Sequence, residues 1–139
     1  MKKGDCIIVT NNPLAQEKLG EEFSVYFVNG GYTDVLTRVR DMVYVGHGLL
    51  THPLMGSVKP DVTPYRTVAV SKKTDEFSAE YSQIISNSIA ATEKSTLPAK
   101  HFEQRILKDL QLVDLSLICS GLEGMGAADN NRTKGGIFF

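Results

Sequence analysis

The sequence predicts an α/β fold: a single-domain, three-layer, Rossmann-like arrangement with a mainly parallel sheet of about four to five strands and a C-terminal pair of helices. Short β-branched apolar runs alternate with segments of helical periodicity in the first half of the chain, which is typical of crossovers between parallel strands. The 139 residues, 42% of them hydrophobic, are enough for one core, so we expect a single domain over residues 1–139.

The elements of the first half are predicted in chain order from local signals. Cys6–Thr10 is an uninterrupted apolar run, typical of a strand buried on both faces. Asn12 can cap the helix that follows, with Pro13 at its first position, and this helix ends near Gly20. The next elements are a strand over 23–28, a helix with apolar residues from Val35 to Val43 that stops at Gly46, an apolar run within 47–54 and a strand over 65–71.

Two helices are predicted in the second half, over 77–89 and 102–117, with no strand between them. Two arrangements stay open for them: a helical hairpin that covers the sheet, or a surface through which two copies form a homodimer. The segment 121–139 is rich in glycine and asparagine, and we expect it to be a mobile C-terminal tail.

Charge and composition exclude several classes of partner. The 15 lysines and arginines stand against 16 aspartates and glutamates, and the net charge of -1 gives no electrostatic case for binding nucleic acid or an anionic membrane. The apolar run at Cys6 is too short for a signal peptide or a membrane span, which favours a cytoplasmic protein. Cys6 and Cys119 lack metal-ligand spacing, so we expect both as buried, small apolar residues without a disulfide.

Candidate site residues cluster in the loops that leave the predicted strands, because the carboxyl ends of parallel strands share one edge of a sheet. His52 can act as an acid or base near neutral pH, although it equally suits a structural hydrogen bond to a backbone carbonyl. Backbone amides near Gly56 and the charge of Lys59 suit an anion, the alternative for the lysine being an ordinary exposed side chain. The candidate ligand-binding residues are Asn11, Asn12, Thr51, His52, Gly56, Ser57 and Lys59.

Asn11 and Asn12 precede a helix whose first N–H groups can bind a phosphate or carboxylate. Helix capping explains one of the two asparagines, and the other indicates a ligand. His47 lies between two glycines at a helix end, where we expect it to contact terminal carbonyls, and His101 is expected at the surface.

Several familiar motifs are excluded. Gly121–Gly126 carries three glycines, but it follows a helical pattern, whereas a dinucleotide-binding loop follows a strand. Ser57 lacks the Gly-x-Ser-x-Gly setting of a hydrolase nucleophile. His47 and His52 have no third ligand at a predictable spacing for zinc. We therefore predict no metal site and no cofactor, and His52 is the candidate catalytic residue.

Four stretches of the sequence together resemble a known family: Thr10-Asn11-Asn12-Pro13-Leu14, Arg40-Asp41, Gly46-His47-Gly48-Leu49-Leu50-Thr51-His52-Pro53-Leu54-Met55-Gly56-Ser57-Val58-Lys59-Pro60, and Thr63-Pro64-Tyr65. They are similar to the GrdX family, small bacterial proteins encoded with the glycine, sarcosine and betaine reductase genes of amino-acid-fermenting anaerobes. The resemblance runs from about Cys6 to Leu122. The family commonly has Ser where Met55 stands and Asn-Glu where Asp61-Val62 stand, which argues against a hydroxyl role at position 55.

The resemblance implies a context rather than a reaction, because the family has no established activity and assigns no catalytic residue. It implies an accessory or regulatory protein of a selenium-dependent reductase system that converts glycine to acetyl phosphate. In that role the protein binds a small anionic metabolite or a reductase component without turnover. Two alternatives stay open. One is a small enzyme in which His52 is the general acid or base on a phosphate- or carboxylate-bearing metabolite held by Lys59, and the other is an interaction module that acts through its C-terminal helices.

Overall fold

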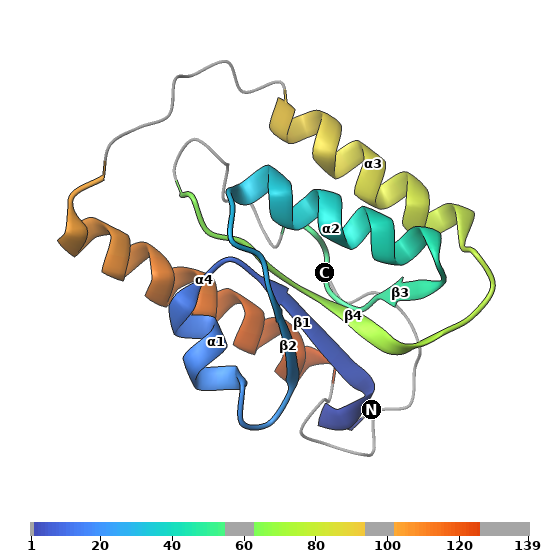
Figure 1. The fold of residues 1–139 in the computed structure, drawn as a ribbon, viewed down its shortest axis with the longest axis horizontal. Coiled ribbons are helices and arrows are strands. Elements are labelled where there is room, and N and C mark those ends of the chain that lie inside the picture. Colours follow the sequence, from blue (N-terminus) through green and yellow to red (C-terminus); the bar gives the residue numbers. More distant parts are fainter. Residues whose placement is uncertain (1, 55–62, 94–101, 126–139) are drawn as a thin grey trace.

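The computed structural model describes residues 2–54, 63–93 and 102–125, which form a four-stranded mixed sheet with helices on both faces (Figure 1). The strands are β1 (Cys6–Thr10), β2 (Ser24–Phe27), β3 (His47–Leu49) and β4 (Thr67–Thr74), in the spatial order β2-β1-β4-β3. The helices are the short 3-10 helix η1 (Lys3–Asp5), α1 (Pro13–Leu19), α2 (Tyr32–Tyr44), α3 (Ala79–Glu93) and α4 (Gln104–Gly124).

The direction of β4 sets the sheet topology. β1 pairs with β2 in parallel, but β4 is antiparallel to both β1 and β3, so the predicted mainly parallel, Rossmann-like sheet is wrong. A parallel connection between β3 and β4 would need a crossover helix, and the described residues between these strands contain none, whereas an antiparallel pair needs only a loop. The prediction was wrong because the apolar run Val68-Ala69-Val70 shows only that the strand is buried on both faces. Such a run looks the same whether the strand is parallel or antiparallel to its neighbours.

Helices cover both faces of the sheet, and the sheet separates two hydrophobic cores. On one side α2 and α3 pack over Val9, Val68 and Val70, and on the other α1 and α4 pack over Ile8 and Ala69. The side chains of β4 thus alternate between the two cores, as the period of a strand requires. The two C-terminal helices lie on opposite faces (Figure 1), so they do not form the helical hairpin that the sequence left open.

Local signals at the ends of α1 and α2 operate as the sequence predicted. The Asn12 side chain accepts a hydrogen bond from the Leu14 N–H at 3.0 Å, and Pro13 occupies the first turn. Beyond α2, Gly46 has φ of 110°, and a Cβ at this position would overlap the Asp75 carbonyl oxygen. Glycine is therefore required where the chain turns from α2 into β3.

The two cysteines form no disulfide with each other; Cys6 belongs to the core on the α1/α4 side and Cys119 packs against it. Cys6 is buried, as expected, and Cys119 is half-buried. Burial, assisted by the charge of Asp5, raises the pKa of Cys6 to about 11. Burial and then the charge of Glu123 raise the pKa of Cys119 as well. Both thiols are therefore weakly reactive at neutral pH.

The C-terminal part of the described chain is more ordered than the sequence indicates. Helix α4 continues to Gly124, so the first residues of the predicted tail are helical, while residues 126–139 lie outside the described part. The glycines at 121 and 124 therefore belong to a helix. Within the described ranges, no helix combines the length and the apolar character needed to cross a membrane.

Candidate functional site

The loops that the sequence predicts to carry the ligand-binding residues lie at one edge of the sheet. Because β4 is antiparallel to both neighbours, β1 and β3 run in the same direction, and the residues after β1, β2 and β3 meet the residues before β4 at this edge. Asn11 ties them together. Its Nδ2 donates to the carbonyls of Gly30 at 3.0 Å and Pro64 at 2.8 Å, and its Oδ1 accepts from the Arg66 N–H at 2.9 Å.

Asn12 makes a second set of bonds on the α4 side of the same edge. Besides capping α1, its Nδ2 donates to the Gln111 carbonyl at 2.9 Å and to Oδ2 of Asp114 at 3.0 Å. Both amide hydrogens of Asn11 and of Asn12 are thus used within the protein. The two asparagines therefore connect the loops of this edge to one another and to α4, and the ligand contact that the sequence indicates for one of them stays a prediction.

Thr51 and His52 follow β3 at the same edge. Thr51 is buried, and its Oγ1 accepts from the Ala69 N–H at 2.9 Å, which extends the pairing with β4. The His52 ring is half-exposed, and its Nδ1 accepts from the Leu54 N–H at 3.1 Å. Burial and the nearby charge of Arg66 lower the pKa of His52 below its usual value of 6.5. At neutral pH the imidazole is therefore uncharged, with its proton on Nε2.

Three of the predicted site residues, Gly56, Ser57 and Lys59, lie outside the described residues, as does His101. His47 differs from its prediction. It begins β3, and its Nδ1 lies 2.7 Å from the carbonyl oxygen of Ser71 rather than at the carbonyls of a helix end.

Arg66 is the residue that sequence reasoning missed. It is only 1% exposed, and it precedes β4 on the side of Val68 and Val70, towards α2 and α3. Its guanidinium carbon lies 4.9 Å from the centroid of the Tyr32 ring, at the N-terminus of α2. Among the described residues, its buried Nε and Nη1 have no hydrogen-bond partner. The signal in the sequence was a lone arginine at a position that alternates with two core valines.

Asp114 is the buried anion of the same edge, on the opposite face. It is 4% exposed, and Oδ2 accepts from Oγ1 of Thr67 at 2.6 Å as well as from Asn12. The Thr67 hydroxyl also lies 2.7 Å from that of Thr10. Burial raises the pKa of Tyr32. The charge of Arg66 opposes this rise and the charge of Asp114 adds to it, so both buried charges affect the Tyr32 hydroxyl. Within the described residues no salt bridge joins Arg66 to Asp114.

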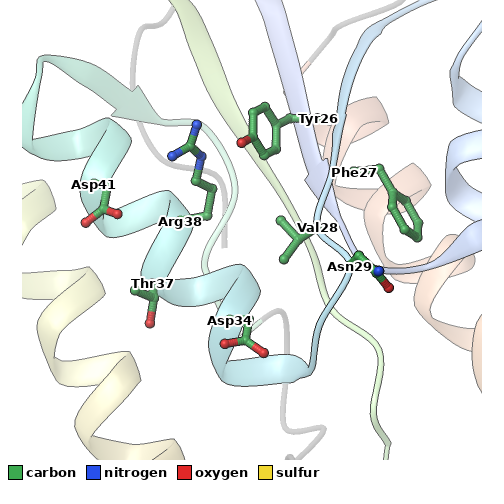
Figure 2. A pocket seen from close by; sticks show the side chains of 8 residues that line it. All are labelled: Tyr26, Phe27, Val28, Asn29, Asp34, Thr37, Arg38 and Asp41. Atoms are coloured by element: carbon green, nitrogen blue, oxygen red, sulfur yellow. The ribbon is translucent and has the colours of Figure 1, made fainter.

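Two surface hollows lie on the side of the sheet that α2 and α3 cover. The first, of about 230 Å³, lies beside His52, and its lining residues are His52, Leu54, Ile84, Asn87 and Ser88. The second, of about 290 Å³, lies between β2 and α2, and Figure 2 shows its lining residues: Tyr26, Phe27, Val28, Asn29, Asp34, Thr37, Arg38 and Asp41. In the second hollow the Arg38 guanidinium carbon lies 4.3 Å from the centroid of the Tyr26 ring.

The arrangement can bind an anion. Nε and Nη1 of the buried Arg66 guanidinium lack an acceptor in the described part of the chain, and an unpaired buried donor is costly, so an anion is the ligand that these nitrogens fit. His52 beside it offers a neutral imidazole at a hollow that opens to the surface.

The chain matches a known protein family. A family described as GrdX-like protein matches residues 7–123, which is most of the chain. No curated protein and no solved structure matches.

Proposed function

The chain belongs to the GrdX-like protein family, and from this premise we propose that it is an accessory protein that binds a small anion at the edge of its sheet. By its name the family is associated with glycine reductase-type systems, and we place the protein alongside a glycine, sarcosine or betaine reductase. The anion acts there as a signal or as a ligand shared with a reductase component, without turnover.

The observation that carries the proposal is Arg66. Arginine is almost never fully buried unless it is paired, and Nε and Nη1 of Arg66 have no partner among the described residues. Tyr32 stabilises the cation through its ring and through a side-chain hydrogen bond, but Nε and Nη1 still have no partner among the described residues. An anion at this position would supply the missing acceptors, and charge-assisted hydrogen bonds of this kind are about twice as strong as neutral ones.

A thermal-shift experiment tests the proposal. Wild type, Arg66→Met and Arg38→Met are titrated with phosphate, acetyl phosphate, acetate, butyrate, glycine, sarcosine and betaine. A ligand at a hundredfold excess over its Kd stabilises the fold by about 2.7 kcal/mol, which gives a readable shift in Tm. We expect a shift with at least one compound in wild type and in Arg38→Met, and none in Arg66→Met.

The control variants separate lost binding from lost folding. Arg66→Lys keeps the charge but not the planar set of donors, so we expect weakened rather than abolished binding. An equal shift in Arg66→Met and wild type would contradict the proposal, as would the absence of a shift with every compound.

A second candidate function is a small enzyme, which the position of His52 favours. His52 lines a hollow on the same side of the sheet as Arg66 and is uncharged at neutral pH, and its Nδ1 can act as a base after it releases the hydrogen bond from the Leu54 N–H. Turnover of any compound that shifts the Tm, lost in His52→Gln while binding persists, would support the enzyme over the binding protein.

A third candidate, the interaction module, draws on exposed apolar side chains of α4, namely Ile106, Leu112 and Val113. Replacing Leu112 and Val113 by serine would then abolish capture of a reductase component and leave anion binding unchanged.

A further inference from the structure

The electrostatics of the edge limit the charge of the anion. Arg66 and Asp114 are both buried, their formal charges cancel, and His52 adds no charge at neutral pH. A monoanion on Arg66 leaves one negative charge that is directly hydrogen-bonded to the guanidinium. A dianion leaves a second negative charge in a site of low dielectric with Asp114 across the sheet, and an uncompensated buried charge is strongly unfavourable. The charges of the described residues therefore favour a monoanion.

The hollow beside His52 is a place where the uncharged part of the same ligand can bind. Leu54 and Ile84, which line it, also pack against the core cluster that contains Tyr32. Tyr32 in turn lies under the Arg66 guanidinium, and the charge of Arg66 reaches His52 in the wall of the hollow. The guanidinium and the hollow therefore lie on the same side of the sheet, towards α2 and α3.

The lining of the hollow is of mixed polarity. Leu54 and Ile84 supply apolar surface, while Asn87 and Ser88 supply polar groups from α3. The Ser88 hydroxyl donates to the Ile84 carbonyl at 2.8 Å, so its oxygen is left as an acceptor. A volume of about 230 Å³ admits a body of a few carbon atoms.

We infer that the ligand is a small monocarboxylic acid whose carboxylate binds Arg66 and whose short carbon chain extends towards the hollow between His52 and α3. This inference rests on the proposed anion-binding function and narrows it to one class of compound. Inorganic phosphate and sulfate lack the apolar body and carry more charge, so they are poor ligands of this site.

Calorimetric titration of the full chain at pH 7.5 and constant ionic strength tests the inference. The probes are sodium acetate, propionate and butyrate, with sulfate and inorganic phosphate as the dianionic comparison. We expect the affinity to rise from acetate to butyrate, because each buried methylene contributes roughly 0.8 kcal/mol. Butyrate should bind at least about tenfold more tightly than phosphate or sulfate, a difference of about 1.4 kcal/mol.

Two variants of exposed positions on α3 locate the carbon chain. Asn87→Phe places a ring in the hollow, and Ala90→Phe adds the same ring to a neighbouring exposed position that does not line it. We expect Asn87→Phe to weaken butyrate binding about tenfold and acetate binding much less, with Ala90→Phe close to wild type. Both variants change exposed side chains, so folding is retained.

The outcomes separate this inference from the proposed function. If phosphate or sulfate binds through Arg66 as tightly as butyrate, the monocarboxylate is wrong while anion binding stands. If butyrate binds but Asn87→Phe does not weaken it, the placement of the carbon chain is wrong. If no probe binds wild type, or all bind Arg66→Met equally, the proposed function itself fails.

Discussion

Two arginines of this protein stack on tyrosine rings, and their surroundings differ sharply. Arg38 lies 4.3 Å from the centroid of Tyr26, which is 40% exposed in an open hollow beside β2 (Figure 2). Arg66 lies 4.9 Å from the centroid of Tyr32, which is 5% exposed. The first pair is partly exposed, although Nε of Arg38 is buried without a partner among the described residues, whereas both members of the second pair are buried. The stack of Arg38 on Tyr26 is therefore an ordinary surface contact, whereas the stack of Arg66 on Tyr32 is a buried contact at which the cation lacks hydrogen-bond acceptors from the described residues.

From this difference we infer that a candidate binding site is indicated by the burial and partners of a guanidinium more than by its aromatic neighbour. The carboxylates of Asp34 and Asp41 line the hollow of Arg38, so its charge has both water and anions nearby. Arg66 has Asp114 on the opposite face of the sheet and two nitrogens without acceptors in the described part of the chain. The predictions below test this difference, beginning with the largest effect.

Replacing each tyrosine by alanine should give the clearest contrast. Tyr32→Ala removes a buried ring from the core under α2, and we expect the free energy of unfolding to fall by about 3 kcal/mol. Tyr26→Ala removes a half-exposed ring and should lower it by about 1 kcal/mol. Urea denaturation followed by circular dichroism measures both. Equal losses would mean that the two stacks are equally buried in solution.

Replacing the carboxylate near each arginine comes next in size. Asp114→Asn weakens the hydrogen bonds from Asn12 and Thr67 in a buried network, and we expect a loss of about 2 kcal/mol. Asp41→Asn breaks only an exposed salt bridge with Arg40 and should change stability by less than about 0.5 kcal/mol. The same denaturation curves report both, and a cost at Asp41 as large as that at Asp114 would contradict the distinction.

The pH dependence of stability should show the lowered pKa of His52, which burial and then the charge of Arg66 cause. The pKa of His52 is lowered in the folded state, so the unfolded chain binds this proton first as the pH falls below about 6.5. The fold therefore loses stability from His52 as the pH falls from about 6.5, and His52→Gln should remove this part of the slope.

An NMR titration of the His52 ring resonances gives the matched test. In Arg66→Met the pKa of His52 should rise, because the repelling charge is gone, while Arg38→Met should leave it unchanged. No change in Arg66→Met would remove the electrostatic link between the two residues.

The smallest effect is expected at the half-buried Arg38. Arg38→Met loses a solvated cation–π contact, which contributes about 0.5–1 kcal/mol, and regains part of it through the apolar methionine chain. We expect a net change within about 0.5 kcal/mol in denaturation. A larger loss would show that the buried Nε of Arg38 contributes more than its exposed surroundings indicate.

Local features of the fold could be predicted from the sequence, and non-local ones could not. The cap at Asn12 and the turn at Gly46 depend on neighbouring residues, and both predictions are confirmed. The direction of β4 depends on pairing with β1 across most of the chain, and a run buried on both faces carries no sign of direction. The helices α3 and α4 follow one another, yet nothing in their periodicity says that they pack on opposite faces.

The candidate site divides in the same way. The sequence placed His52 at the loop edge, and the structure places it there too, beside a hollow. The partners that occupy Asn11 and Asn12, such as Pro64 and Asp114, are distant in sequence, so their structural role could not be read from composition. Arg66 was overlooked because its burial follows from the alternation of β4 between two cores. The ligand-binding roles of all seven predicted residues stay predictions: Asn11, Asn12, Thr51, His52, Gly56, Ser57 and Lys59.

The position of β4 in the middle of the sheet has a consequence for synthesis of the chain on the ribosome. β1, β2 and both of their helices emerge well before residue 67, and until then β1 has one edge without a partner. Such an edge on a strand with apolar residues on both faces invites aggregation. We expect fragments that end before β4 to be insoluble, and those that extend through Thr74 to recover solubility, in a series of truncated chains assayed by sedimentation. Nascent copies of this protein therefore depend on the strand that arrives last to close the sheet.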